Sequence, residues 1–405
     1  MTLRIAMVSM HSHPLAQPGT SNAGGMNVYI TEVAKRLAEL ECMVDLFTLS
    51  NEDYSQDIFR GVRLIGIKPS GRIGPQMVDM LNHVPGFAQR ILEHEPYDIF
   101  HSHYWLSGMA SDIVSSQLDT PHILNMHTIG AVKNTLLAEG DDPEPPIRLE
   151  SEKRLARKVS KVITSTLTEA SAVSRYYGIR FENIAVVSPG VDTTVFYPKG
   201  NCTQENEGGN HLWAPVATNP AGFLAVLSRI QPLKGQDLAI RTLASLRKIM
   251  FDKCPSLIIA GDQSEKYNNY AASLRRMALD LQVEDLVHFT GVISRKQVAM
   301  VMRNAQLLLV PSHSETFGLV TLEAAASGTP VVASLTDGLI DAIVPNITGI
   351  LIAERNPDIW AKNIANLLMN KNRRKSLSQS SVRHAQDHDW TKTAAQILSL
   401  YRQFV

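Results

Sequence analysis

Hydrophobic positions in the first half of the chain alternate between two kinds of run. Residues 3–9 form a short apolar run rich in β-branched side chains, which predicts a buried strand. Residues 26–40 place apolar side chains at every third or fourth position, which predicts an amphipathic helix. The same patterns predict strands at 43–49, 62–67, 97–101, 121–126, 161–165 and 183–187, and helices near 104–117 and 147–159. This alternation favours the α/β class, with a parallel sheet covered on both faces.

The pattern breaks between residues 198 and 221, where Asn, Gly, Pro and Thr dominate and predict a linker or insertion. Beyond this break the alternation restarts, with strands predicted at 223–227, 256–260, 286–289, 306–310, 330–333 and 349–352. We therefore expect two α/β units of similar size that are joined once. The predicted bounds are 1–198 for the first domain, 199–221 for the linker, 222–385 for the second domain and 386–405 for a last helix.

The last helix carries a single apolar stripe. Its members follow one another at spacings of four, three, four and three residues: Trp390, Ala394, Ile397, Tyr401 and Phe404. A stripe of this kind has to pack on another part of the molecule. Either domain could receive it, and packing back on the first domain is one of the two expectations.

The charge balance excludes some function classes. The chain of 405 residues has 39 Lys and Arg and 39 Asp and Glu, so a general nucleic-acid or membrane-surface binder is not expected. The longest runs without charge, 5–31 and 208–228, are interrupted by polar residues and Pro, so no membrane span is expected. Cys42, Cys202 and Cys254 are far apart and form no disulfide framework. A reducing, cytoplasmic location is therefore expected.

The first strand–helix loop, residues 10–27, is long for such a connection, and long loops of this kind are usually functional. Gly24 and Gly25 stand just before the predicted helix, where backbone amides suit an anion. The spacing does not match the dinucleotide fingerprint GxGxxG. A plain turn and helix start remains the alternative interpretation.

The second domain begins with a strand followed by Arg229 and Lys234, in the loop that leads to the next helix. In an open α/β sheet this loop lies at the carboxyl edge, where ligands bind. Two cations there could hold a diphosphate and stabilise it as it departs. A solvated pair is the alternative.

Glu315 and Glu323 have seven residues between them, near the start of a predicted helix. Residues 316–319 would present free amides at the helix start, which is a second anion site. Glu323 lies about two turns inside an otherwise apolar helix, and it could accept hydroxyl groups such as those of a ribose. Spaced glutamates are common, and on their own they more often have no functional role.

Histidines are unusually clustered, which raises the question of a zinc site. The six are His11, His13, His101, His103, His122 and His127. No Cys or Asp recurs beside them at metal-ligand spacing, so a metal site is not favoured. His127 follows a predicted strand and so reaches the same sheet edge as the first loop.

The segments RIQPLKG and SETFGLVTLE together resemble the retaining glycosyltransferases of the GT-B fold, family 4. The resemblance implies two Rossmann-like domains that face a central cleft. The first loop, HSHYWLSG, MHTIGAVKN and VVSPGVD are similar to family members that move N-acetylglucosamine from UDP-N-acetylglucosamine to 1D-myo-inositol 3-phosphate in mycothiol biosynthesis. A different acceptor or donor, as in sucrose-type or polysaccharide glucosyltransferases, and a non-catalytic nucleotide-sugar sensor remain open.

The resemblance also implies a role for individual residues. The implied acceptor-binding residues are His11, Asn22, Ala23, Gly24, Gly25, Met26, Asn27, Arg72, Tyr104, Thr128 and Arg148. The implied donor-binding residues are Gln17, Pro18, Gly25, Arg229, Lys234, Ile293, Glu315 and Glu323. The implied catalytic residues are His127, Arg229, Lys234 and Glu315.

The family also implies a homodimer and no metal for catalysis. A structural magnesium ion, held mostly by backbone carbonyl groups, would lie at Met302, Arg303, Ala305 and Thr329. The chain departs from the family at Asn22, where an aspartate is common, and at Arg72, where a lysine is expected. Arginine differs from lysine in geometry, so this second departure bears on phosphate recognition.

Overall fold

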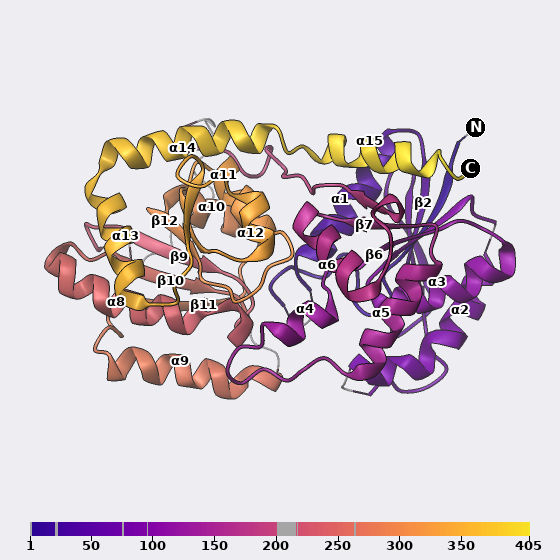
Figure 1. Cartoon of the computed structure of the whole chain (residues 1–405), viewed down its shortest axis with the longest axis horizontal. Helices are drawn as coiled ribbons and strands as arrows, with labels where there is room; N and C mark the ends of the chain where they lie inside the picture. The colour runs from indigo at the N-terminus through magenta and orange to yellow at the C-terminus, as the bar shows by residue number, and fades with distance from the viewer. Residues whose placement is uncertain are drawn as a thin grey trace.

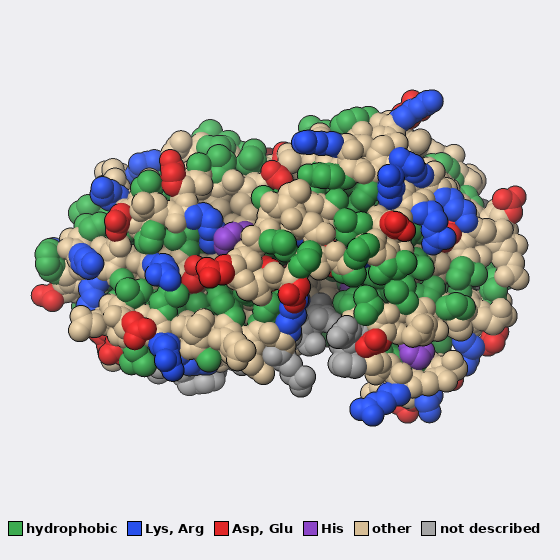
Figure 2. Space-filling model, turned by 60° about the horizontal axis from the view of Figure 1, so that its bottom comes forward, with side chains coloured by type: hydrophobic (Ala, Val, Ile, Leu, Met, Phe, Trp, Pro, Cys, Tyr) green, Lys and Arg blue, Asp and Glu red, His purple; other side chains and the backbone are tan. Residues whose placement is uncertain are grey.

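The computed structural model describes residues 2–20, 23–74, 77–94, 96–200, 216, 218–262 and 265–405. Two open sheets with helices on their faces lie end to end, the first on the right and the second on the left of Figure 1. This arrangement confirms the α/β GT-B architecture expected from the sequence. Figure 2 shows acidic and basic side chains interspersed over one face, in agreement with the equal counts of 39 each.

The first sheet has the strand order β3-β4-β2-β1-β5-β6-β7-β8. Its strands are β1 (Arg4–Val8), β2 (Met43–Leu49), β3 (Tyr54–Phe59), β4 (Val62–Ile67), β5 (Ile99–His103), β6 (His122–Asn125), β7 (Lys161–Thr164) and β8 (Ile184–Val186). Its helices are α1 (Gly25–Glu39), η1 (Met77–His83), α2 (Val84–Leu92), α3 (Trp105–Leu118), α4 (Gly130–Thr135), α5 (Pro146–Lys158) and α6 (Leu167–Tyr177). A short turn, η2 (Phe181–Asn183), precedes β8. The centre of the sheet is buried on both faces, and its strands are mostly apolar except in β5 and β6, which carry buried His, Ser and Asn side chains.

The sequence missed strand β3, and the expectation of a wholly parallel sheet was wrong at this edge. β3 pairs antiparallel with β4, from Tyr54 opposite Gly66 to Phe59 opposite Val62. It lies at the edge of the sheet, and three of its six side chains are exposed. A polar edge strand of this kind lacks the buried run that marks a central strand, and its exposed charge, Asp57, discourages pairing with another chain.

The second sheet is parallel throughout, with the order β11-β10-β9-β12-β13-β14. Its strands are β9 (Phe223–Leu227), β10 (Ser256–Ala260), β11 (Val287–Gly291), β12 (Leu307–Val310), β13 (Val331–Ser334) and β14 (Gly349–Ile352). Its helices are α8 (Gln236–Met250), α9 (Asn268–Asp280), α10 (Arg295–Asn304), α11 (Leu319–Ala326), α12 (Asp337–Ala342), α13 (Pro357–Met369) and α14 (Lys371–Gln386). Short turns η3 (Pro232–Lys234), η4 (Phe251–Lys253) and η5 (Glu265–Tyr267) lie between them.

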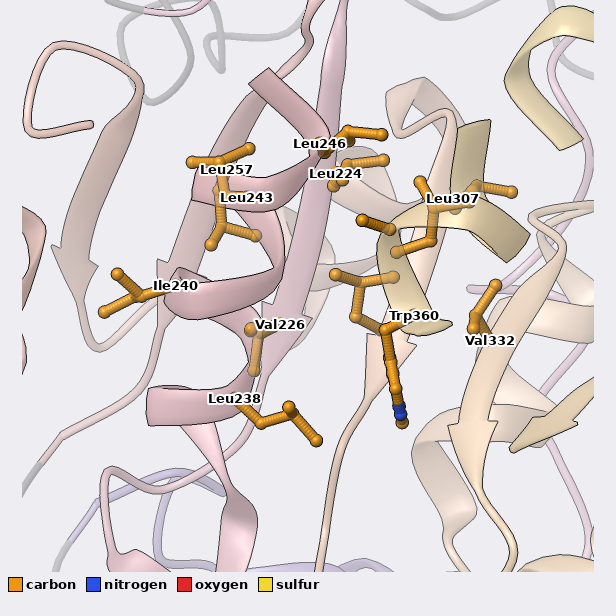
Figure 3. Packing of buried hydrophobic residues seen from close by; sticks show 14 of the residues in the cluster. Leu224, Val226, Leu238, Ile240, Leu243, Leu246, Leu257, Leu307, Val332 and Trp360 are labelled. Carbon is orange, nitrogen blue, oxygen red and sulfur yellow. The ribbon is translucent and has the colours of Figure 1, made fainter. Parts of the chain in front are cut away.

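The core of the second domain lies between this sheet and helices α8 and α13. Leu243 of α8 and Trp360 of α13 converge on Leu224 and Leu257 of the sheet (Figure 3). Trp360 is fully buried, and its indole N–H donates to the carbonyl of Glu354 at 3.0 Å. The one polar group of this side chain is therefore satisfied inside an apolar core.

The last helix, α15 (Trp390–Tyr401), packs on the first domain, which decides between the two expectations for its apolar stripe. Helix α14 runs along the second domain and α15 continues across to helix α1 of the first (Figure 1). Trp390 and Tyr401 are buried in the same cluster as Tyr29 of α1. The crossing passes so close to Gly190 that a Cβ there would lie 2.3 Å from the backbone nitrogen of Trp390. Only glycine fits at that position.

Replacing Trp390 with alanine should destabilise the first domain by about 3–5 kcal/mol, because a large and fully packed side chain leaves a cavity. Chemical denaturation followed by circular dichroism measures the loss of unfolding free energy. Gln396→Ala is the matched control, since this exposed residue of the same helix should change stability by less than about 0.5 kcal/mol. A loss at Trp390 no larger than at Gln396 would contradict the packing of α15.

Three further expectations from the sequence concern the cysteines, the linker and membrane-spanning segments. Cys42 and Cys254 are buried and unpaired, whereas Cys202 lies outside the described residues. Most of the predicted linker, 199–221, also lies outside them. In the parts of the chain that the structure describes, every helix is too short or too polar to cross a bilayer.

Candidate active site

The loops at the carboxyl ends of both sheets meet between the two domains, and we call this region the interdomain site. The side-chain amide of Gln17 donates to the carbonyl of Ile293 at 3.0 Å. The hydroxyl of Thr316 donates to the carbonyl of His127 at 2.7 Å. These bonds join the loops that follow β1 and β6 to the loops that follow β11 and β12. The carboxyl edge of an α/β sheet is where ligands of this fold class bind.

The second-domain side of the interdomain site, which the resemblance assigns to the donor and which we call the donor side, holds a compact charged group. The ammonium group of Lys234 lies 2.5 Å from Oε1 of Glu315, which also accepts from Ser312 Oγ at 2.9 Å. Burial lowers the pKa of Arg229, and the nearby Tyr267 and Glu315 oppose this change. The structure thus brings the two cations that the sequence singled out for a diphosphate, Arg229 and Lys234, together with Glu315, which the resemblance assigns to the donor. Glu315 offsets one cation, which leaves the group able to take up further negative charge.

Two helix N-termini meet at the same place. A Cβ on Gly25, the first residue of α1, would lie 3.2 Å from Cδ1 of Leu319, the first residue of α11. The amides of the first turn of a helix have no partner inside the helix, and the helix dipole favours negative charge there. Because Gly25 has no side chain, the first turn of α1 can approach the first turn of α11. Both helix ends are of the kind that can bind an anion.

Glu323 is the fifth residue of α11, about one turn from its start rather than the two that the sequence suggested, and it lies beside an interdomain ion group. Nη2 of Arg295 lies 3.8 Å from Glu323 Oε1 and 3.7 Å from Oε1 of Glu32, which belongs to α1 of the first domain. The pKa of Glu323 is raised to about 7. Burial is the main cause, Arg295 opposes the rise, and the negative charge of Glu32 adds to it. A half-buried carboxylate in this position can accept hydroxyl groups from a sugar when it is ionised.

The acceptor side is organised around Arg148 of α5, whose side chain is only 2% exposed. Its guanidinium group donates to Thr128 Oγ1 at 2.8 Å and lies over the Tyr104 ring at 4.7 Å. It also pairs with Glu152 at 2.7 Å and with Glu144 at 2.8 Å. The structure thus brings Tyr104, Thr128 and Arg148 together. It also pairs the arginine with Glu144 and Glu152, which are its neighbours in sequence.

His11 connects the acceptor side to the donor side. Its ring lies 4.3 Å from the ring of Tyr104. Burial, together with the charges of Arg148 and Arg229, lowers the pKa of His11 to about 3. The imidazole is therefore neutral at physiological pH, with Nδ1 buried and unpartnered among the described residues. Both cations act on one ring, so the two halves of the site are close neighbours.

Asn27 has a structural role in the first loop. Its side-chain amide donates to Ser12 Oγ at 2.9 Å and to the carbonyl of His13 at 2.8 Å, and its oxygen accepts from the N–H of Gly24 at 2.9 Å. These bonds use both amide protons, so the side chain fixes the loop from inside. Asn22, the departure from the family pattern, lies outside the described residues.

The other loop residues that the resemblance implies take mixed positions. Ala23 is buried, whereas Met26 and Pro18 are half-buried and Gln17 is exposed apart from its bond to Ile293. Exposed side chains at the rim of the loop are free to contact a ligand, while Ala23 could contribute only its backbone. The roles of these residues remain predictions.

The structure does not bring Arg72 to the acceptor residues. Arg72 is exposed in the loop that follows β4, and no described contact joins it to Tyr104, Thr128 or Arg148. A different cation stands beside them, because Lys133 of α4 forms an ion pair with Glu144. Sequence reasoning missed Lys133, whose only signal is its place five residues after Thr128 in MHTIGAVKN.

The histidines form a hydrogen-bonded group. Nδ1 of His103 lies 2.9 Å from Nε2 of His127, and Nε2 of His101 lies 2.8 Å from Oδ1 of Asn125. The hydroxyl of Tyr401, on the last helix, lies 2.5 Å from Nδ1 of His101. In the described ranges, no three His, Cys, Asp or Glu side chains are arranged as metal ligands. The cluster is therefore a polar core that links α15 to the site.

His127 is the member of this group that reaches the interdomain site. Burial lowers its pKa to about 3, so the ring is neutral. Its backbone has φ of 59°, a left-handed conformation that is uncommon outside glycine and that is found disproportionately at functional positions. The bonds to His103 and from Thr316 hold it in this conformation from both domains.

The residues expected to hold magnesium form a closed turn. The carbonyl of Met302 already accepts from Thr329 Oγ1 at 2.5 Å and from the N–H of Ala305 at 3.2 Å. The Arg303 guanidinium donates to the carbonyl of Val195 at 3.2 Å. Magnesium needs oxygen ligands in near-octahedral geometry, and one of the expected oxygens is engaged twice. The turn as arranged fits the ion poorly, and none of the chemistry proposed below involves it.

Both halves of the chain match known families of glycosyltransferases. Residues 24–190 match the family described as Glycosyl transferase 4-like domain. Residues 216–383 match the family described as Glycosyl transferases group 1. The break between the two matches falls close to the break in the hydrophobic pattern.

Individual relatives match over almost the whole chain. The D-inositol 3-phosphate glycosyltransferase of Kribbella flavida is 35% identical, over 98% of this chain and 95% of its own length. The protein of the same name from Corynebacterium glutamicum is 34% identical, over 100% of this chain and 97% of its own. Among solved structures, sucrose-phosphate synthase from Thermosynechococcus elongatus aligns with a TM-score of 0.85 and 25% identity, covering 99% of this chain and 98% of that one.

Proposed function

The chain belongs to the GT-B glycosyltransferases of family 4, and on this premise we propose that it moves N-acetylglucosamine from UDP-N-acetylglucosamine to 1D-myo-inositol 3-phosphate. The products would be UDP and 1D-myo-inositol 2-acetamido-2-deoxy-alpha-D-glucopyranoside 3-phosphate, a step of mycothiol biosynthesis. The names of the full-length relatives support the acceptor. The donor is supported by the cations, the helix ends and the carboxylate on the second-domain side of the site.

The donor would lie with its diphosphate against Arg229, Lys234 and the first turn of α11. These groups stabilise charge that develops on the leaving diphosphate, and in a site shielded from water such stabilisation is worth far more than in solvent. The ribose hydroxyls would reach Glu323, and the uracil would lie near the backbone of Ile293. The side chain of Gln17, from the first domain, already donates to the carbonyl of Ile293. The backbone of Ile293 would therefore take part both in donor binding and in the contact between the domains.

We propose that the transfer retains the configuration of the anomeric carbon. The carboxylate nearest to the diphosphate group, Glu315, is paired with Lys234 and so is a poor nucleophile. The acceptor hydroxyl would attack from the face that UDP leaves, and the departing phosphate would take its proton. NMR of the product tests this step: an anomeric configuration opposite to that of the donor would refute it.

The observation that carries the choice of acceptor is the group Tyr104, Thr128 and Arg148 beside Arg229. A buried arginine with a hydroxyl donor and an aromatic ring suits a dianionic phosphate, whereas a neutral sugar needs no cation there. UDP release with inositol 3-phosphate, free inositol and fructose 6-phosphate as competing acceptors tests the assignment. Equal release with free inositol would overturn it, and preference for the fructose ester would favour a sucrose-type enzyme.

We expect the affinity for the donor to fall as the pH drops through about 7. The pKa of Glu323 is raised to about 7, so the carboxylate gains a proton below that pH and no longer binds ribose as an anion. Arg295 and Glu32 are the charged groups that face it. The KM for UDP-N-acetylglucosamine should rise by about tenfold between about pH 8 and about pH 6, as expected for one titrating group.

The variant Glu323→Gln is the matched control for this pH dependence. It keeps the shape of the side chain and removes the titrating group, so its KM should be high at every pH and should vary little. Initial rates at saturating acceptor give the profile. A wild-type KM that stays constant across this range would contradict the prediction. A variant that keeps the wild-type slope would assign the pH dependence to another group.

A further inference from the structure

Glu144 bridges two cations at the acceptor side of the site. One carboxylate oxygen pairs with the ammonium group of Lys133, and the other lies 2.8 Å from Nη1 of Arg148. The carboxylate therefore occupies the position between the two cations, beside Thr128 and Tyr104. An anionic group that meets two cations through two oxygens has the same recognition chemistry as a bound phosphate.

The two carboxylates on Arg148 differ in how firmly they are held. Glu152 is 1% exposed and also accepts from the N–H of Gly130 at 2.9 Å and from the hydroxyl of Tyr177. Glu144 is 18% exposed, and among the described residues its carboxylate is seen to pair with the two cations alone. Glu152 is therefore part of the frame that orients the arginine. Glu144 can leave its place without abandoning a buried hydrogen bond to the backbone.

The backbone of Glu144 stays fixed independently of its side chain. The N–H of Glu144 donates to Oδ1 of Asn134 at 2.7 Å, and its carbonyl accepts from the same side-chain amide at 3.3 Å. In the same loop, Asp141 accepts from the hydroxyl of Tyr267 in the second domain at 3.0 Å. The carboxylate can thus rotate away while the loop keeps its position.

The charges around Glu144 keep it ionised. Burial alone would raise its pKa, but Arg148 and Lys133 lower the pKa below the ordinary value. Burial lowers the pKa of Lys133, and Glu144 opposes that change. Each partner thus supports the charge of the other. Removing the carboxylate without a replacement would leave two neighbouring cations in a partly desolvated site, which is costly.

We propose that Lys133 is a further phosphate-binding residue of the acceptor site, and that the Glu144 carboxylate is an internal substitute which the acceptor phosphate displaces. This inference rests on the proposed function, because it takes the acceptor to be a phosphate ester. Lys133 fills the place that the sequence had assigned to Arg72. Thr128 completes the arrangement, since its hydroxyl oxygen accepts from Arg148 and its proton is free to donate to a phosphate oxygen.

The proposal predicts opposite effects for the two partners. Glu144→Gln keeps the size of the side chain but removes the competing charge, so the Kd for inositol 3-phosphate should fall about three- to tenfold. Lys133→Gln should raise the same Kd by about tenfold or more. The affinity for free inositol should change by less than about twofold in both variants, since neither residue would contact the ring hydroxyls.

Isothermal titration calorimetry of the full chain with inositol 3-phosphate, inorganic phosphate and free inositol measures these affinities without turnover. Glu139→Gln is the matched control, an exposed carboxylate in the same loop that should change none of them. Thermal midpoints of all variants should stay within a few degrees of the wild type.

The sign of the effect at Glu144 decides the outcome. Weaker binding of inositol 3-phosphate to Glu144→Gln would show that the carboxylate only supports the site, and would overturn the proposal. An equal loss of inositol and inositol 3-phosphate affinity in Lys133→Gln would do the same. If the wild type binds inositol 3-phosphate with these variant effects yet releases no UDP, the proposed function fails while the phosphate site stands.

Discussion

Replacing Arg229 with alanine should lower the rate of transfer by about a hundredfold or more, because a preorganised positive charge that stabilises the leaving diphosphate is lost. Lys234→Ala should lose a similar amount, and it should also leave Glu315 without the ammonium partner at 2.5 Å. Glu315→Gln should lose transfer as well while the fold stays intact. The measurement is UDP release at saturating donor and acceptor, which reports kcat rather than binding.

Arg241→Ala is the control for these variants, since Arg241 is exposed on α8 in the same domain. Its kcat should match the wild type, and circular dichroism should show the same fold in all four proteins. A turnover near the wild-type value for Arg229→Ala would remove this residue from the reaction. A variant that loses donor affinity but keeps kcat would assign its cation to binding alone.

Arg148→Ala should weaken the binding of inositol 3-phosphate by about a hundredfold and leave UDP-N-acetylglucosamine binding almost unchanged. The guanidinium group is the most buried cation of the acceptor site, and charge-assisted bonds to phosphate are strong. The variant should also unfold several degrees lower, because Glu152 and Glu144 lose their partner in a buried place. Separate titrations of donor and acceptor measure the two affinities.

Two further variants keep this prediction testable if the alanine variant folds poorly. Thr128→Val removes one hydroxyl and should weaken the acceptor by about tenfold. Arg154→Ala changes an exposed arginine of the same helix and should alter neither affinity. Equal loss of donor and acceptor affinity in both Arg148→Ala and Thr128→Val would show that the arginine only stabilises the domain.

Most strands could be predicted from the sequence because each carries a short and mostly apolar run. Strands β2, β4, β9, β10 and β14 have the bounds that the hydrophobic pattern predicts. Strand β3 could not be found in this way, since none of its side chains is buried, and among the described strands it pairs with β4 alone. The domain on which α15 packs could not be predicted either. An apolar stripe shows that a helix packs against another part of the protein, but it does not show which part.

The donor side of the site was predictable because each residue follows a strand or begins a helix, and the carboxyl edge of the sheet gathers such positions. Arg229, Lys234 and Glu315 meet for this reason. The acceptor residues are only partly readable in this way. Glu144 and Glu152 each lie four residues from Arg148, a spacing at which side chains near a helix can pair. The ion pair of Glu144 with Lys133 spans eleven residues, and local spacing gives no sign of it.

The return of α15 to the first domain sets the order in which the chain can fold during synthesis. Trp390 and Tyr401 complete a core that is otherwise built from residues of the first domain, among them Tyr29. A ribosome delivers those residues after both sheets, so the first domain stays incomplete until α15 has emerged, while the second domain already has most of its own core. Domains usually fold in the order in which they emerge. Here we expect the native first domain to form only once α15 has been made, and a chain that terminates before α15 would expose this core to the proteases and chaperones that remove unfinished proteins.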